Sequence, residues 1–138
     1  MKGVVLNVLV FVACVFAGGL ANGLIIQYSD AIIPAPAGAN LKTEEGLKAA
    51  MAIMEPKHFI MPFLAHAIGT LLGAFLVTFF IKDRKLFRAL LVGFLFFSGG
   101  AWMVFELPSP LWFDAVDLGL AYIPMAWIGY KLALRVSK

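Results

Sequence analysis

Polar and ionisable residues inside apolar stretches are the groups of this sequence that could do chemistry. His66 lies within His58–Ile81, a stretch that contains no Asp, Glu, Lys or Arg. Asp114 and Asp117 lie three residues apart near the start of another apolar stretch, so on a helix they would share a face. Asn22 lies near the end of the first apolar stretch. Ionisable groups within membrane spans are rare and often functional, so these residues are the first candidates for a site.

An imidazole beside a carboxylate can relay protons, bind a cation or coordinate a transition metal. The sequence therefore predicts a candidate polar pocket whose residues are His66, Asp117, Asp114 and Asn22, with Glu106 and His58 at the rim. The alternative is structural: Asp117 pairs with His66 to fix helix packing, and Asp114 caps a helix or reaches the membrane interface. The residues favour this structural interpretation over a pocket with a ligand.

Several kinds of chemistry find little support. The two histidines, His58 and His66, are too far apart on one helix to bind one metal or haem together, and the chain has no third histidine. The single cysteine, Cys14, rules out an internal disulfide, a CxxC redox pair and a Cys-rich metal site. Ser98, Thr70 and Thr78 have no base beside them in sequence. We therefore predict no catalytic residue, no metal and no cofactor.

The composition is that of an integral membrane protein. Of the 138 residues, 62% are hydrophobic and 14% charged, against about 45–50% and about 25% in soluble domains. The mean hydropathy is +0.94. The net charge of +3 could suggest nucleic acid as a partner, but the basic residues gather at the ends of apolar stretches. We expect one membrane domain that contacts the lipid bilayer and no nucleic acid.

The pattern of apolar stretches predicts an all-α fold, a four-helix transmembrane bundle running up-down-up-down. The spans are expected at about residues 3–26, 58–81, 86–105 and 111–134. An extra amphipathic interfacial helix is expected at about 43–55, with Thr43 as N-cap and Glu44 and Glu45 in its first turn. Pro56 is expected to end it.

The first apolar stretch has two alternatives to a transmembrane helix. A cleaved secretory signal would have a shorter apolar core than this stretch. A lipoprotein signal would need a lipobox, and Phe11-Val12-Ala13-Cys14 fits one poorly. The favoured interpretation is a transmembrane helix in which Cys14 is a small residue at a helix contact.

Small residues at helical spacing mark the expected helix contacts. Gly69 and Gly73 form a GxxxG pattern in the second span, and Gly18 and Ala21 lie on one face of the first. Such residues let helix backbones approach closely. We expect close packing at these positions, either within the bundle or between copies of the chain.

The distribution of basic residues predicts the orientation. With both termini cytoplasmic, the inside segments would hold eight basic residues and the outside segments three. The eight are Lys2, Lys82, Arg84, Lys85, Arg88, Lys131, Arg135 and Lys138, and the three are Lys42, Lys48 and Lys57. This asymmetry follows the positive-inside rule. A bacterial inner membrane is the expected location.

Three segments carry a resemblance: Glu55–Phe59, Ala65–Ala74 and Ala121–Trp127. The chain resembles an uncharacterised family of small bacterial four-span membrane proteins over most of its length, and this resemblance implies no activity. It is not similar to the small multidrug exporters, which depend on a Glu in the first helix. We expect an oligomeric accessory or structural membrane protein, self-associating or part of a larger complex. The alternative is a small transporter or ligand-binding protein with His66 and Asp117 as its proton- or cation-responsive centre.

Overall fold

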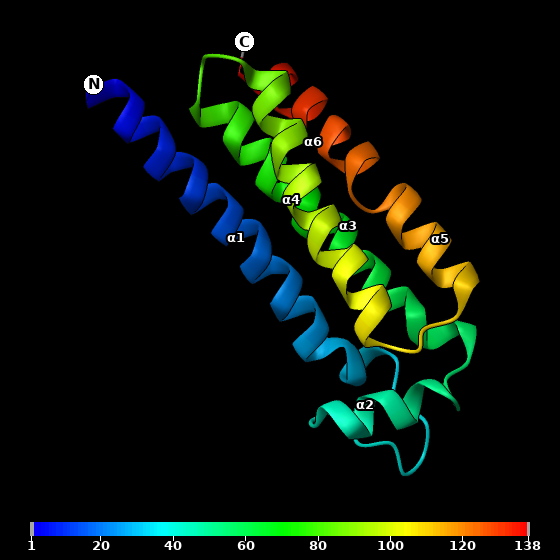
Figure 1. The fold of residues 1–138 in the computed structure, drawn as a ribbon. Helices are drawn as coiled ribbons and strands as arrows, with labels where there is room; N and C mark the ends of the chain where they lie inside the picture. The colour runs from blue at the N-terminus through cyan, green and yellow to red at the C-terminus, as the bar shows by residue number, and fades with distance from the viewer. Residues whose placement is uncertain (1, 138) are drawn as a thin grey trace.

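The computed structural model describes residues 2–137, which form helices and short connections without any strand in that range. The elements are α1 (Lys2–Ile32), α2 (Glu44–Met51), the 3-10 helix η1 (Pro56–Phe59), α3 (Ile60–Phe80), α4 (Lys85–Glu106), α5 (Leu111–Leu120) and α6 (Ile123–Val136). Four segments are long and apolar enough to cross a membrane: Gly3–Ile32, Pro56–Phe80, Lys85–Glu106 and Leu111–Val136. The predicted all-α bundle is confirmed, and the chain is a small multi-pass membrane protein (Figure 1). Lys138, which the charge count includes, lies outside the described residues.

Helix α3 is the centre of the bundle. It packs against α1, α4 and α6, while α4 and α6 also pack against each other. Helix α1 packs chiefly along α3. The bundle is therefore a three-helix core of α3, α4 and α6 with α1 added along α3, as Figure 1 shows.

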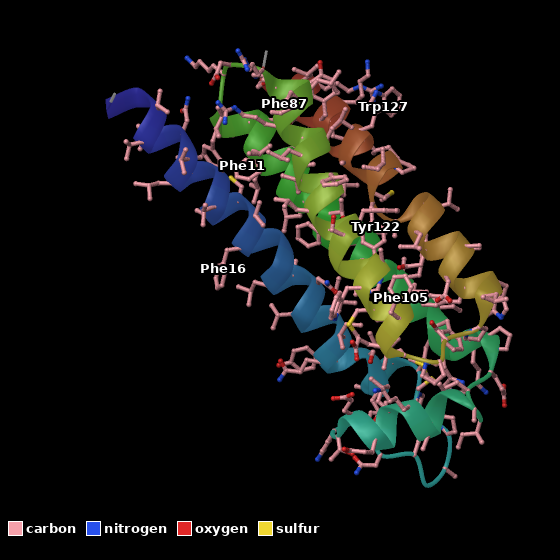
Figure 2. The ribbon with its side chains drawn as sticks, viewed as in Figure 1. Phe11, Phe16, Phe87, Phe105, Tyr122 and Trp127 are labelled. Carbon is pink, nitrogen blue, oxygen red and sulfur yellow. The ribbon has the colours of Figure 1, made fainter. Side chains whose placement is uncertain are left out.

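The core is built from small and medium side chains, and large apolar side chains cover the outside. One cluster of buried residues consists of Cys14, Ala74, Val77, Ile81, Ala89, Val92 and Ala126. Phe16 of α1 and Phe105 of α4, both labelled in Figure 2, are exposed. Lipid tails are as apolar as these side chains, so small residues that allow close backbone contact belong inside a membrane bundle.

Helix α1 extends to Ile32, beyond the expected end near residue 26. The polar residues that follow the apolar stretch do not break a helix, and the Ser29 hydroxyl donates a hydrogen bond to the carbonyl of Ile26 (2.7 Å). The chain then turns where the Asp30 carboxylate accepts a hydrogen bond from the Ala35 backbone N–H (2.6 Å). The first span thus continues past its apolar part.

Helix α2 begins as expected and ends early. The Thr43 hydroxyl accepts a hydrogen bond from the Gly46 N–H (3.1 Å), so Thr43 is the N-cap. The helix ends at Met51 rather than near residue 55. Pro56, expected to end α2, instead begins η1, a position at which its missing N–H costs nothing. In Figure 1, α2 lies across the end of the bundle at which α1 ends.

The fourth span is broken, whereas a continuous span over 111–134 was expected. Its halves α5 and α6 are separated by Ala121 and Tyr122, and the backbone of Tyr122 (φ −116°, ψ −81°) is not helical. Pro124 has no N–H to donate to the carbonyl four residues earlier. The interruption therefore falls one residue ahead of this proline, because α6 begins at Ile123.

Candidate functional site

His66 and Asp117 meet between α3 and α5. Nδ1 of His66 lies 2.8 Å from Oδ1 and 3.0 Å from Oδ2 of Asp117. His66 lies about 9 Å along the helix axis from the start of α3, given a rise of about 1.5 Å per residue. The Asp117 side chain is 6% exposed and that of His66 23% exposed. The two polar groups predicted from the sequence as a pair are thus in direct contact.

Tyr122 joins this pair from the break between α5 and α6. Its hydroxyl donates a hydrogen bond to Oδ2 of Asp117 (2.7 Å). Its ring stacks on the His66 imidazole, with centroids 5.7 Å apart, and the residue is buried. Figure 2 shows Tyr122 in the middle of the molecule, beside the break. We call His66, Asp117 and Tyr122 the polar cluster.

Helix α4 supplies the space that Tyr122 needs. A Cβ added to Gly100 would overlap the Tyr122 hydroxyl and ring, whereas a Cβ on the neighbouring Gly99 would meet nothing within 4 Å. The Phe97 ring packs edge-on against the Tyr122 ring, with centroids 6.0 Å apart. The second, third and fourth spans therefore meet at the polar cluster. The first span, α1, contributes no side chain to it.

The polar cluster can hold or move a proton at one atom, Nε2 of His66. An ionised Asp117 accepts hydrogen bonds from His66 and Tyr122, which fixes the His66 tautomer with its proton on Nδ1. Nε2 of His66 then carries a free lone pair, and it forms no hydrogen bond within residues 2–137. Among those residues, no group of three His, Cys, Asp or Glu side chains could hold a metal ion.

Asp114, expected in the pocket, and the expected rim residues His58 and Glu106 lie away from the polar cluster. Asp114 is buried at the start of α5, where it accepts a hydrogen bond from the Ser109 hydroxyl (2.5 Å). Nδ1 of His58 accepts a hydrogen bond from the Glu55 N–H (2.9 Å) and helps to cap η1. Glu106 is exposed at the end of α4. No hydrogen bond or ion pair joins Asp114, His58 or Glu106 to the cluster in the described part of the chain.

Asn22 packs beside the cluster rather than in it. A Cβ on Gly69 would lie 2.9 Å from the Asn22 Cβ, and Gly69 is less than one helical turn from His66. The Asn22 side-chain oxygen is buried and has no hydrogen-bond partner among residues 2–137. The hydroxyl of the buried Thr70 is unpaired in the same sense. No hydrogen bond links Asn22 to His66 in the described part of the chain.

The small residues predicted to pack do so within the chain, where α1 crosses α3. A Cβ on Gly18 would lie 2.5 Å from the carbonyl oxygen of Gly69 and 3.2 Å from the Cα of Gly73. Cys14, one turn earlier on α1, is 4% exposed and packs in the same contact. Ala21 is half-buried. The backbones approach so closely that no side chain larger than hydrogen fits at Gly18.

Two surface hollows lie at the opposite end of the bundle from α2. One, of about 580 Å³, is lined by Phe79, Lys82, Lys85, Val136 and Ser137. The other, of about 400 Å³, is lined by Trp127, Ile128, Lys131, Leu132 and Arg135. Neither includes a residue of the polar cluster, whose members Asp117 and Tyr122 are buried. The Asp117 carboxylate is covered by the surrounding side chains and does not line either hollow.

The role of Tyr122 was not predicted from the sequence. Two features could have indicated it. A tyrosine in the middle of an apolar span needs a partner for its hydroxyl. Pro124, two residues later, predicts an interrupted helix that would turn this side chain inward.

Comparison of the chain with protein families, with curated proteins and with solved structures finds no match.

Proposed function

We propose that this multi-pass membrane protein is an accessory or structural component, in which the polar cluster locks the broken fourth span onto α3. The observation that supports this most is the state of Asp117. Both of its carboxylate oxygens accept hydrogen bonds, from His66 and from Tyr122, while the side chain is 6% exposed. A carboxylate whose acceptor sites are occupied by its own chain is suited to holding helices together.

The fourth span needs such a lock. Helix α5 packs only lightly against α3 and α4, and the break before α6 leaves it without continuous helical support. An unpaired polar group in hydrocarbon costs several kcal/mol, so the cluster members favour staying together. The cluster thus replaces the packing that α5 lacks.

The proposal includes a location and an assembly. The excess of basic residues at one end of the bundle supports cytoplasmic termini in a bacterial inner membrane, with the cluster in the outer half. Helix α1 leaves apolar side chains such as Phe16 uncovered on the sides away from α3. This surface favours lipid contact together with self-association or membership of a larger membrane complex.

A second candidate function rests on His66. Its side chain is 23% exposed and its Nε2 forms no hydrogen bond in the described part of the chain. Nε2 could accept a proton or a ligand donor, with Asp117 stabilising the charged ring. This geometry favours a proton- or cation-responsive transporter or binding protein as the alternative.

Neutral variants of the cluster separate the two functions. Asp117→Asn and His66→Gln are compared with Glu106→Gln, which changes an exposed glutamate. For a structural role, the first two lose about 1–3 kcal/mol of stability in detergent, and Glu106→Gln does not. Vesicles with the wild-type protein and a trapped pH dye then leak protons no faster than empty vesicles. Faster proton entry that Asp117→Asn abolishes without loss of stability would establish the transporter instead.

A further inference from the structure

The end of the bundle opposite α2 carries an excess of unpaired positive charge. The basic residues at this end whose side chains the structure describes, which we call the basic end, are Lys82, Arg84, Lys85, Arg88, Lys131 and Arg135. Asp83 is the acidic residue among them, and its carboxylate is occupied: Oδ2 accepts a hydrogen bond from Arg88 (2.8 Å) and Oδ1 from Asn7 (3.0 Å). Within residues 2–137, Lys82 and Lys85 form no ion pair.

The larger hollow at the basic end has a cationic side and an apolar side. Lys82 lines it from the turn between α3 and α4, Lys85 from the first residue of α4, and Ser137 follows the end of α6. Phe79, in the last turn of α3, and Val136, the last residue of α6, line the rest and are 42% and 62% exposed. Figure 2 shows nitrogen-tipped side chains gathered at this end. The hollow lies at the ends of three helices that are long and apolar enough to cross a membrane.

We propose that this hollow binds the phosphate group of an anionic phospholipid. The ammonium groups of Lys82 and Lys85 and the hydroxyl of Ser137 supply hydrogen-bond donors for phosphate oxygens. Phe79 and Val136 supply an apolar surface for the glycerol and the first acyl carbons. Lysines near a membrane surface attract anionic lipid by roughly fivefold in affinity each.

The apolar side of the hollow distinguishes a lipid from free phosphate. A soluble anion would gain nothing from the exposed Phe79 and Val136, whereas an amphiphile covers both. The hollow also lies at the ends of three membrane spans, where a lipid headgroup resides. This inference concerns the end of the chain opposite the polar cluster and is independent of the function proposed above.

The test measures lipid binding to the purified full-length protein by native mass spectrometry in detergent. Phosphatidylglycerol is titrated against phosphatidylcholine of the same acyl chains. The double variant Lys82→Gln/Lys85→Gln is expected to bind phosphatidylglycerol about thirtyfold more weakly, with binding of phosphatidylcholine unchanged. Neither lysine is buried, so the double variant is expected to fold.

The matched control is Lys131→Gln/Arg135→Gln, which removes the same charge from the smaller hollow at the same end. It is expected to change phosphatidylglycerol binding by less than about fivefold. Equal losses in both double variants would mean diffuse surface charge and would overturn the site. Equal wild-type affinity for the two lipids would overturn it as well. Competition by inorganic phosphate at millimolar concentration as effective as that by lipid would assign the hollow to a soluble anion and refute the proposal.

Discussion

The hydroxyl of Tyr122 lies against Gly100, in the space that a Cβ on that residue would need. The same hydroxyl donates a hydrogen bond to Asp117, which also contacts His66. A glycine on α4 thus determines whether a tyrosine at the break in the fourth span can reach a carboxylate on α5. Close packing at Gly100 and polar bonding at Asp117 are therefore parts of one arrangement.

Replacing Gly100 by alanine tests this dependence. The added Cβ has to displace the Tyr122 ring, so Gly100→Ala is expected to cost about 1–3 kcal/mol, as overpacked core positions do. Gly99→Ala is the matched control because a Cβ there meets nothing within 4 Å. Thermal unfolding in detergent measures both. Equal stability of the two variants would show that the tyrosine moves aside at no cost.

Removing the Tyr122 hydroxyl alone isolates its hydrogen bond. Tyr122→Phe keeps the ring on His66 and leaves the Asp117 carboxylate with one partner fewer, so we expect a loss of about 1.5–3 kcal/mol. Tyr28→Phe, which alters an exposed tyrosine on α1, is the control. Unfolding in detergent measures the difference. An unchanged stability in Tyr122→Phe would mean that Asp117 does not depend on this bond.

The contact between α1 and α3 can be followed with the native cysteine. Gly18→Ala places a Cβ against the Gly69 carbonyl and should separate the helices, which exposes the buried Cys14. We expect Cys14 to react with a maleimide at least about tenfold faster, the change produced by an opening of about 1.4 kcal/mol. Gly19→Ala, which adds a Cβ in open space, should leave the rate unchanged. Slow labelling in both variants would show that α1 adjusts without opening.

The ion pair between Asp83 and Arg88 is expected to make the stability of the fold fall in acid. The hydrogen bond from Arg88 is the main cause that holds the pKa of Asp83 below the ordinary value of an aspartate. A carboxyl group whose pKa is lower in the folded state stabilises the fold above its unfolded pKa, and the gain is lost as the pH falls through the folded value.

Wild-type protein should therefore lose more stability than Asp83→Asn when the pH falls from 5 to about 2.5. Since Asp83 is exposed, the difference is expected to be small. Arg88→Gln should behave like Asp83→Asn, because either change removes the pair. Unfolding temperatures at a series of pH values measure this. An acid sensitivity that survives in both variants would assign it to other groups.

The sequence alone was sufficient for the elements that depend on local composition. Hydropathy over a span-length window located the four membrane helices, since a long apolar stretch with few charges favours hydrocarbon whatever it packs against. Thr43 predicted the start of α2, because an N-cap acts on a backbone N–H three residues away. Pro124 also acts locally, since it lacks the N–H for a helical hydrogen bond, yet the break ahead of it was not predicted.

Relations between distant residues needed the tertiary structure. The sequence alone places His66 and Asp117 inside two apolar stretches, but it does not say which faces of the two helices turn towards each other. The rotation of each helix about its axis is set by packing. Gly18 leaves room for the backbone of Gly69, and Gly100 leaves room for the Tyr122 side chain. The same packing left Asn22 against Gly69 and without a bond to the cluster. Hydropathy is a property of each residue and its neighbours in sequence, whereas a hydrogen bond needs two groups within about 3 Å, and only the packed bundle determines that distance.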